Sequence, residues 1–433
     1  MNAGLITRAL GRGPGAAWVT IAVLSAMTTP CLWAQASSSD TLRLAEAVQL
    51  ALQANPMLQA ARAAAVAARE RVGPAGALPD PQIQFNTMNR AGPSYSYVGN
   101  VMTQNQEQLV LTIPWPWKLK SAHRAAEHTA AATGADADEH ARMLVAQVRM
   151  AYYNVAYADR ALAVLAQTRG LLRDLLTVST TMYAVGSAVQ QDVLRAQVEV
   201  GRMTEEITRM SQERIAMAAR LDALLGLDAT IPVRALELPE PAGELPAVDS
   251  LVARALAARP ALRAGAERVA AADASLSAAR RELFPDVQVS VATNQSYRLG
   301  PTIDLMAWFT IPIFAPWKQF AMRREAAALR DMSRAELLSV RHETVARIIE
   351  TRARAEQDRN LARLYRTSII PQAQAAVQTS LASYRVGRLS FMQLIDNQMT
   401  VNQYETETYR LIADYHQAVG DLEALVGGPL DQQ

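Results

Sequence analysis

The sequence predicts a mainly α-helical chain that is internally duplicated and carries two strands in each half. Three observations favour this fold class. A Tyr-x-x-Gly bend occurs twice at an offset of 201 positions, with Gly186 in the first copy and Gly387 in the second. Long, proline-poor helical stretches flank both bends, and two segments of period-two alternation precede each of them. Half of the 433 residues are apolar and 19% are charged, so the chain can bury a large surface.

The N-terminal segment, residues 1–36, has the pattern of a secretory signal peptide. Two arginines precede an apolar run at 16–27 that is too short to span a membrane, and an A-x-A cleavage site follows at 34–36. The alternative is a buried N-terminal helix. The single cysteine, Cys31, lies in this segment, and because a proline precedes it, we do not expect it to be lipidated.

Composition excludes several classes of function. Removal of the signal peptide takes away two of the 43 basic residues, which leaves as many basic as acidic residues and argues against a nucleic-acid partner. The remaining chain has no cysteine, and its five histidines form no metal-binding motif. Asp138, Glu139 and His140 are interpreted as a solvated helix face rather than a metal site. No catalytic grouping stands out, so we expect no metal, no cofactor and no enzyme.

Residues 37–248 form the first predicted unit. Short helices are followed by a strand pair at about 82–114, where apolar and polar residues alternate. A helical hairpin is predicted over about 117–226, and a proline-rich linker occupies 227–248.

Residues 249–433 repeat this order. Helices at about 249–282 precede a strand pair at about 285–313, and a second helical hairpin at about 317–427 precedes a short tail. Since this repeat is about 200 residues long, it is far longer than the period of a solenoid.

The returning helix of the first hairpin carries a coiled-coil seam. Its heptad positions predict buried methionines that pack in the core, in preference to a ladder of soft-metal ligands. Both bends also carry a Ser-x-x-Gln pattern, Ser187 with Gln190 and Ser390 with Gln393, that predicts a capping box at the start of each returning helix. The two rows of the seam are Val193, Val200, Ile207 and Leu221, and Ala196, Met203, Met210, Met217 and Leu224.

Two strands in each half cannot close a barrel, and four are still too few. No run after the signal peptide reaches the ~18 apolar residues of a transmembrane helix. If the strands enter a membrane, their open edges require a homo-oligomer that pools them, because lipid cannot satisfy backbone groups. Three copies would supply twelve strands and twelve long helical segments.

This combination of signal peptide, duplication, strand pairs and Tyr-x-x-Gly hairpins resembles the TolC family, the outer membrane factors of tripartite efflux and type I secretion. The resemblance covers the whole mature chain. It implies a homotrimer in which a twelve-stranded β-barrel in the outer membrane lipid continues as a long periplasmic α-helical barrel. It also implies two partners, a periplasmic adaptor protein and an inner-membrane RND-type pump.

In that family the bends lie at a periplasmic aperture that Tyr, Arg and Asp side chains close. The resemblance makes eight residues gate candidates, for which the alternative is a solvated helix end. They are Tyr384, Arg385, Arg388, Gln393, Asp396, Tyr183, Asp192 and Arg195. Contact with the adaptor is expected at the bends themselves, at Val185, Gly186, Ser187, Val386, Gly387 and Arg388.

Within the family, the segments at 78–82 and 114–118 are most similar to the branch that exports copper and silver or cobalt, zinc and cadmium. Four tryptophans near the strand ends are expected at the membrane interface, with ordinary strand-end packing as the alternative. They are Trp115, Trp117, Trp308 and Trp317.

The export duct competes with two other interpretations. One is a structural periplasmic coiled-coil or adaptor protein without a pore, and the other is the exit duct of a type I secretion system. The duplicated strand pairs argue against an adaptor, which would carry one hairpin and a different β-domain.

Overall fold

The computed structural model describes residues 41–88, 103–227, 235–241, 243–296 and 300–430. The predicted signal peptide lies outside them. Helices dominate the described chain, and none of the described helices is both long and apolar enough to cross a bilayer.

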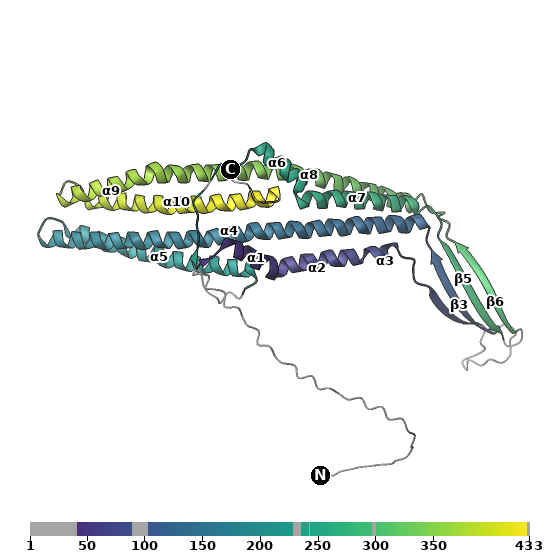
Figure 1. Ribbon diagram of the computed structural model, residues 1–433. Coiled ribbons are helices and arrows are strands. Elements are labelled where there is room, and N and C mark those ends of the chain that lie inside the picture. The colour runs from purple at the N-terminus through teal and green to yellow at the C-terminus, as the bar shows by residue number, and fades with distance from the viewer. Residues whose placement is uncertain (1–40, 89–102, 228–234, 242, 297–299, 431–433) are drawn as a thin grey trace, which may run out of the picture. The chain divides into compact units, whose positions relative to one another are not determined.

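The same order of elements occurs in both halves, with shorter helices, two strands, a long helix, a bend and a returning helix (Figure 1). The first half consists of β1 (Thr41–Leu42), α1 (Leu44–Ala54), α2 (Pro56–Glu70), α3 (Val72–Gly76), β2 (Gln82–Met88), β3 (Gln104–Ile113), α4 (Pro116–Ala184) and α5 (Gln190–Leu225). After β4 (Ala235–Leu236), the second half consists of α6 (Val248–Ala258), α7 (Pro260–Arg281), β5 (Val287–Ser296), β6 (Gly300–Phe309), α8 (Gln319–Leu364), the π-helix η1 (Tyr365–Ile369), α9 (Ile370–Arg385) and α10 (Phe391–Val426).

The four longer strands form one antiparallel sheet in the order β2-β3-β5-β6. The strand pairs of the two halves therefore join through β3 and β5, with Val110 opposite Ser290. At one end of the sheet the chain enters α4, whose 69 residues carry it ~100 Å to the first bend. The sheet and the bends thus lie at opposite ends of the long helices.

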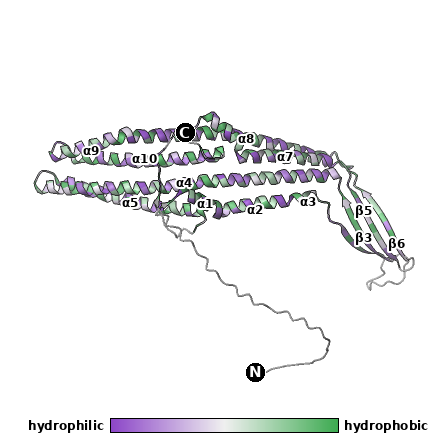
Figure 2. Ribbon diagram, viewed as in Figure 1, coloured by the Kyte–Doolittle hydropathy of each residue, from purple (hydrophilic) through white to green (hydrophobic). Residues whose placement is uncertain are grey.

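Helix α4 packs against α2, α5, α7 and α10, and α8 packs against α7 and α10. Polar and apolar residues are mixed along all of these helices (Figure 2), because each of them also has an exposed face. Met203 and Met210 are buried in the main hydrophobic cluster, and Met217 packs against it. This confirms the interpretation of the heptad methionines as core residues.

The second half holds one more residue than the first between helix start and bend. The Pro-Trp-Lys segments that precede or open the long helices are 200 positions apart, at Pro116 and Pro316, whereas the bend glycines are 201 apart. The π-helix η1 accommodates this residue, since its i→i−5 bonds close a turn that is one residue longer. Pro371, the second residue of α9, lacks the N–H that a regular helix would use.

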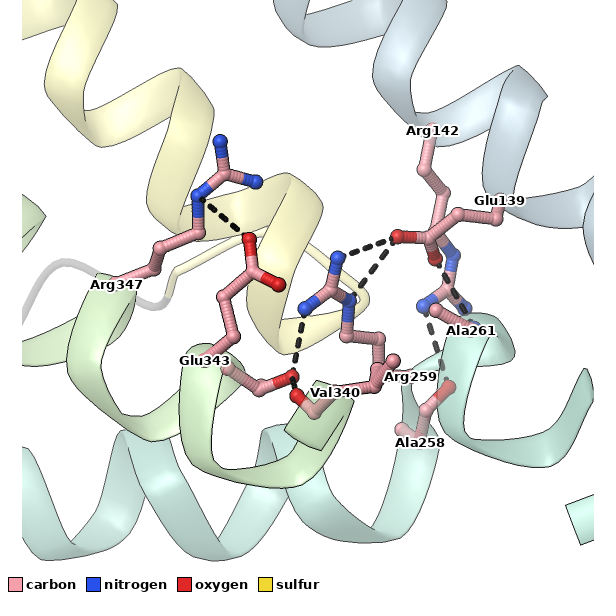
Figure 3. A network of polar contacts seen from close by, with 9 residues as sticks. Glu139, Arg142, Ala258, Arg259, Ala261, Val340, Glu343 and Arg347 are labelled. Atoms are coloured by element: carbon pink, nitrogen blue, oxygen red, sulfur yellow. Dashed lines mark hydrogen bonds and ion pairs between the residues drawn. The ribbon is translucent and has the colours of Figure 1, made fainter. Parts of the chain in front are cut away.

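Two matched junctions join the short helices. Asn55, between α1 and α2, accepts a hydrogen bond from the Leu58 backbone N–H at 3.1 Å and donates one to the Leu224 carbonyl at 2.9 Å. Arg259 occupies the corresponding place between α6 and α7. Its buried guanidinium donates to Glu139 of α4 at 2.8 and 3.0 Å and to Thr344 of α8 at 2.7 Å (Figure 3).

Glu139 also accepts a hydrogen bond from the backbone N–H of Ala261, in the first turn of α7. A carboxylate from a neighbouring helix therefore caps α7. The interpretation of Glu139 as part of a solvated helix face is wrong, because α7 covers it. Asp138 is 60% exposed and pairs with Arg263 on the rim of the same contact.

Two other details differ from expectation. Ser187 forms no capping box, because α5 begins two residues later than that pattern requires and takes Val189 as its N-cap. Ser390 does form one with Gln393.

The proline-rich segment 227–248 contains a short strand, since Ala235–Leu236 pairs in parallel with Thr41–Leu42. The Tyr152 hydroxyl joins the two segments: it donates a hydrogen bond to the Leu42 carbonyl and accepts one from the Glu237 N–H.

Candidate functional site

Both helical hairpins turn through the same backbone geometry. Gly186 has φ +75° and Gly387 has φ +71°, the left-handed conformation that the bend pattern predicts. Each glycine N–H bonds the carbonyl of the tyrosine three residues earlier, and the next N–H bonds the residue before that tyrosine. These are Schellman motifs, which satisfy the last carbonyls of α4 and α9.

One contact joins the two hairpins at their tips. The Tyr384 hydroxyl, at the end of α9, donates a hydrogen bond to Asp192 Oδ2, in the first turn of α5, at 3.3 Å. Tyr384 is 4% exposed and its ring packs against Phe391 with a centroid distance of 5.3 Å. Both residues that make this hydrogen bond are among the gate candidates.

Burial raises the pKa of Tyr384 to about 12, and the negative charge of Asp192 adds to the effect. The phenol therefore stays protonated at any physiological pH and remains a hydrogen-bond donor. Asp192 also suits the first turn of α5, since a carboxylate there complements the helix dipole.

The other gate candidates do not join this contact. Tyr183, Arg385, Arg388 and Asp396 are exposed, and no ion pair or side-chain hydrogen bond of theirs occurs within the described part of the chain. Arg195 pairs with Glu199 along α5, and Gln393 takes part in the Ser390 capping box.

Phe391 is a tip residue that sequence reasoning missed. It is 2% exposed and lies directly after the N-cap of α10, where it supports the Tyr384 ring. Val185 and Val386, before the two glycines, are 70% and 67% exposed, so the expected adaptor-contact positions present apolar side chains to solvent.

The other end of the long helices is held by a buried lysine. Lys118 is 9% exposed, and its ammonium lies 2.9 Å from Asp286 and 3.4 Å from Glu282. Trp115 stacks on Phe284 at 5.4 Å, whereas Trp117, Trp308 and Trp317 are 43–77% exposed. Trp115 therefore has a packing partner at the strand end, and the other three tryptophans are exposed. The expected place of the four at a membrane interface stays a prediction.

Among the residues that the structure describes, no group of three or more His, Cys, Asp and Glu side chains is arranged to hold a metal ion.

Comparison with known proteins gives one family. The outer membrane efflux protein family matches residues 47–227 and 251–428, once in each half. Among curated proteins, the pyoverdine export outer membrane protein OpmQ of Pseudomonas putida is 24% identical over 254 residues. That match covers 56% of this chain and spans about half (53%) of OpmQ.

Solved structures share the fold. CusC is 17% identical with a TM-score of 0.78, covering 89% of this chain and 92% of that one. The outer membrane protein VceC of Vibrio cholerae is 16% identical with a TM-score of 0.76, covering 89% and 96%. The MtrE outer membrane channel of Neisseria gonorrhoeae is 18% identical with a TM-score of 0.73, covering 90% of each chain. The duplicated match and the shared fold together show that this chain belongs to the outer membrane efflux protein family, the TolC family, of the Gram-negative outer membrane.

Proposed function

We propose that this chain forms the exit duct of a tripartite efflux system. Three copies pool their strands into a twelve-stranded β-barrel in the outer membrane, and their long helices continue it as an α-helical barrel through the periplasm. A periplasmic adaptor and an inner-membrane RND-type pump deliver the cargo, and the duct conducts it passively.

The four-stranded sheet is the observation that carries this proposal. Its outer strands β2 and β6 each pair on one side only within the described chain. One face of the sheet is apolar and exposed, with Ile83, Phe85, Ile303 and Leu305 each 67–76% exposed. Open edges need a further strand, and an apolar face of this kind suits lipid. A structural coiled-coil protein without a pore would need neither feature.

The test compares two charge insertions on opposite faces of β6. Leu305→Arg places a charge on the apolar face, where it costs about 2–4 kcal/mol near the bilayer midplane. Thr302→Arg places the same charge on the polar face. We expect the first variant to be lost from the outer membrane fraction and the second to remain there as a heat-modifiable oligomer. Recovery of the unaltered protein as a water-soluble single chain without channel activity would overturn the proposal.

We further propose that the bends form the closed periplasmic aperture of this duct. Asp396 is exposed and has no side-chain partner among the described residues, and Asp192 accepts a hydrogen bond from Tyr384. Both carboxylates lie close to the bends, where the three tips of a trimer would meet. Asp396→Ala, alone or with Asp192→Ala, should raise single-channel conductance. Glu205→Ala, an exposed acidic residue farther along α5, is the control. Unchanged conductance in the double variant would remove both residues from the gate.

The adaptor is proposed to bind at the two bends, where Val185 and Val386 are exposed. Val185→Asp together with Val386→Asp should abolish cross-linking to an adaptor while the trimer persists. A retained cross-link would place the contact elsewhere.

For the cargo we propose heavy-metal ions, on the resemblance of the segments 78–82 and 114–118 to the heavy-metal branch. OpmQ is named for pyoverdine export, so the panel that tests this must include siderophores and drugs as well as metals. Deletion of the gene should lower tolerance to copper, silver, cobalt, zinc or cadmium. A phenotype confined to drugs or to a secreted protein would favour a drug pump or a type I secretion system instead.

A further inference from the structure

The two faces of the sheet differ in polarity and in exposure. On the two central strands, Gln106, Gln108, Ser290 and Asn294 lie on one face and are 1–8% exposed, although the strands of this sheet make their principal contacts with one another. On the outer strands β2 and β6, Gln84 and Asp304 of the same face are exposed. Long amide side chains with so little exposure and no helix packed over them belong to the concave face of a curved sheet. Figure 1 shows that the strands are curved. The polar face is therefore the inner face of any barrel that this sheet joins.

Charge is almost absent from these strands, and its two occurrences lie on opposite faces. Along the described strands β2, β3, β5 and β6, the ionisable side chains are Glu107 and Asp304. Glu107 lies opposite Phe85 and Thr293, on the apolar face. Asp304 lies opposite Ala292, in one rung with Gln84 and Gln108, on the polar face.

The Asp304 carboxylate is held in place by its neighbour strand. Asn294 Nδ2 donates a hydrogen bond to Asp304 Oδ2 at 2.6 Å, and Asn294 itself is 5% exposed. Asp304 is the fifth of ten residues in β6, so the charge is located near mid-height of the strand.

We propose that Asp304 makes the strand-lined part of the channel selective for cations; this inference rests on the proposed trimeric duct. Three copies place three carboxylates in a ring at one height, on a wall that otherwise offers amides, hydroxyls and apolar groups. Rings of acidic side chains attract cations and repel anions, and low-dielectric walls strengthen the field. This ring is separate from Asp192 and Asp396, which lie at the far end of the long helices.

The experiment measures the reversal potential of the reconstituted full-length protein in planar bilayers under a KCl gradient at low ionic strength. Asp304→Asn removes the charge and keeps an acceptor for Asn294. Glu107→Gln removes the same charge one rung away, on the opposite face, and is the matched control. Both variants keep the residues of the bends, so any contribution of those residues to selectivity is the same in each.

We expect Asp304→Asn to lower the ratio of potassium to chloride permeability about twofold or more, and Glu107→Gln to leave it unchanged. Asp304→Glu should keep the original ratio. In about 1 M salt, where the Debye length is ~3 Å, the difference should disappear. If the amide variant does not reach the membrane, Asp304→Ser provides the same measurement.

An unchanged ratio in Asp304→Asn or Asp304→Ser, or an equal fall in Glu107→Gln, would overturn the inference and leave the duct itself standing. An unaltered protein that forms no channel would overturn the proposed function, and the inference with it.

Discussion

The two halves of the chain begin equivalent helices with different chemistry. Asn55 caps α2 from within, through its own side chain, whereas the corresponding Arg259 leaves that task to Glu139 of α4. Arg259 itself donates hydrogen bonds to Glu139 and Thr344, and these bonds join α4, α7 and α8 in one network (Figure 3). The bond that caps α2 is therefore local, although Asn55 also donates to the Leu224 carbonyl of α5, whereas the bond that caps α7 is tertiary. The two halves therefore share the position at which this helix starts but not the hydrogen bonds that cap it.

The hairpins show the same divergence. The second hairpin carries the π-helix η1, a capped start at Ser390 and a buried tyrosine bonded to the other hairpin. The first carries an uninterrupted α4, an uncapped start at Val189 and an exposed Tyr183. Asp358, before the π-helix, corresponds to Ala158 when counted from the two Pro-Trp-Lys segments, and both positions are buried. Most of the polar groups of the hairpins whose removal should lower the unfolding free energy therefore lie in the second hairpin.

The largest effect is expected at the tertiary junction. Arg259→Met leaves the Glu139 carboxylate buried without its partner, which should cost about 3–5 kcal/mol of unfolding free energy. Asn55→Ala, at the local junction, should cost about 1–2 kcal/mol. Thermal unfolding of the detergent-solubilised protein measures both.

The double variant Arg259→Met with Glu139→Met should recover much of this loss, because no unpaired charge remains. Equal losses in Arg259→Met and Asn55→Ala would contradict the distinction between the two junctions.

Asp358 should make stability depend on pH. It is 7% exposed, and burial together with the nearby charge of Asp414 raises its pKa to about 6. Since the folded-state pKa lies above the unfolded value of 3.8, its contribution is fully present below pH 3.8 and is lost as pH rises through 6. The expected loss is about 2–3 kcal/mol.

Asp358→Asn should remove this slope, which unfolding measured between pH 4 and 8 would show. Asp331→Asn on the exposed face of the same helix is the control. A slope that survives in Asp358→Asn would assign the pH dependence to another group.

A smaller effect is expected at the helix starts of the two bends. Ser390→Ala removes the capping box of α10 and should cost about 1 kcal/mol, with faster amide exchange over the first turn of that helix. Ser187→Ala should change little, because α5 begins at Gln190 without a side-chain cap. Similar exchange rates in the two variants would show that the capping box contributes nothing to the bend.

The smallest effect is expected for the tip tyrosines. Tyr384→Phe loses one hydrogen bond to Asp192, which should cost about 0.5–1 kcal/mol and loosen the contact between the hairpins. Tyr183→Phe should be neutral, because Tyr183 is 47% exposed. Unfolding midpoints compare the two variants, and a larger loss in Tyr183→Phe would reverse the assignment.

The sequence by itself determined the repeated order of elements, the strand alternation and the two left-handed glycines, because each depends on local periodicity or backbone sterics. It also contained the one-residue shift between the halves, since the offset changes from 200 at the Pro-Trp-Lys segments to 201 at the bends. Only the tertiary structure decided that Glu139 is covered by α7 and that Tyr384 reaches Asp192 while Tyr183 reaches no such partner. These outcomes depend on which helices pack together. The contacting residues are 120 to 192 positions apart in the sequence, so no local sequence pattern predicts that they meet.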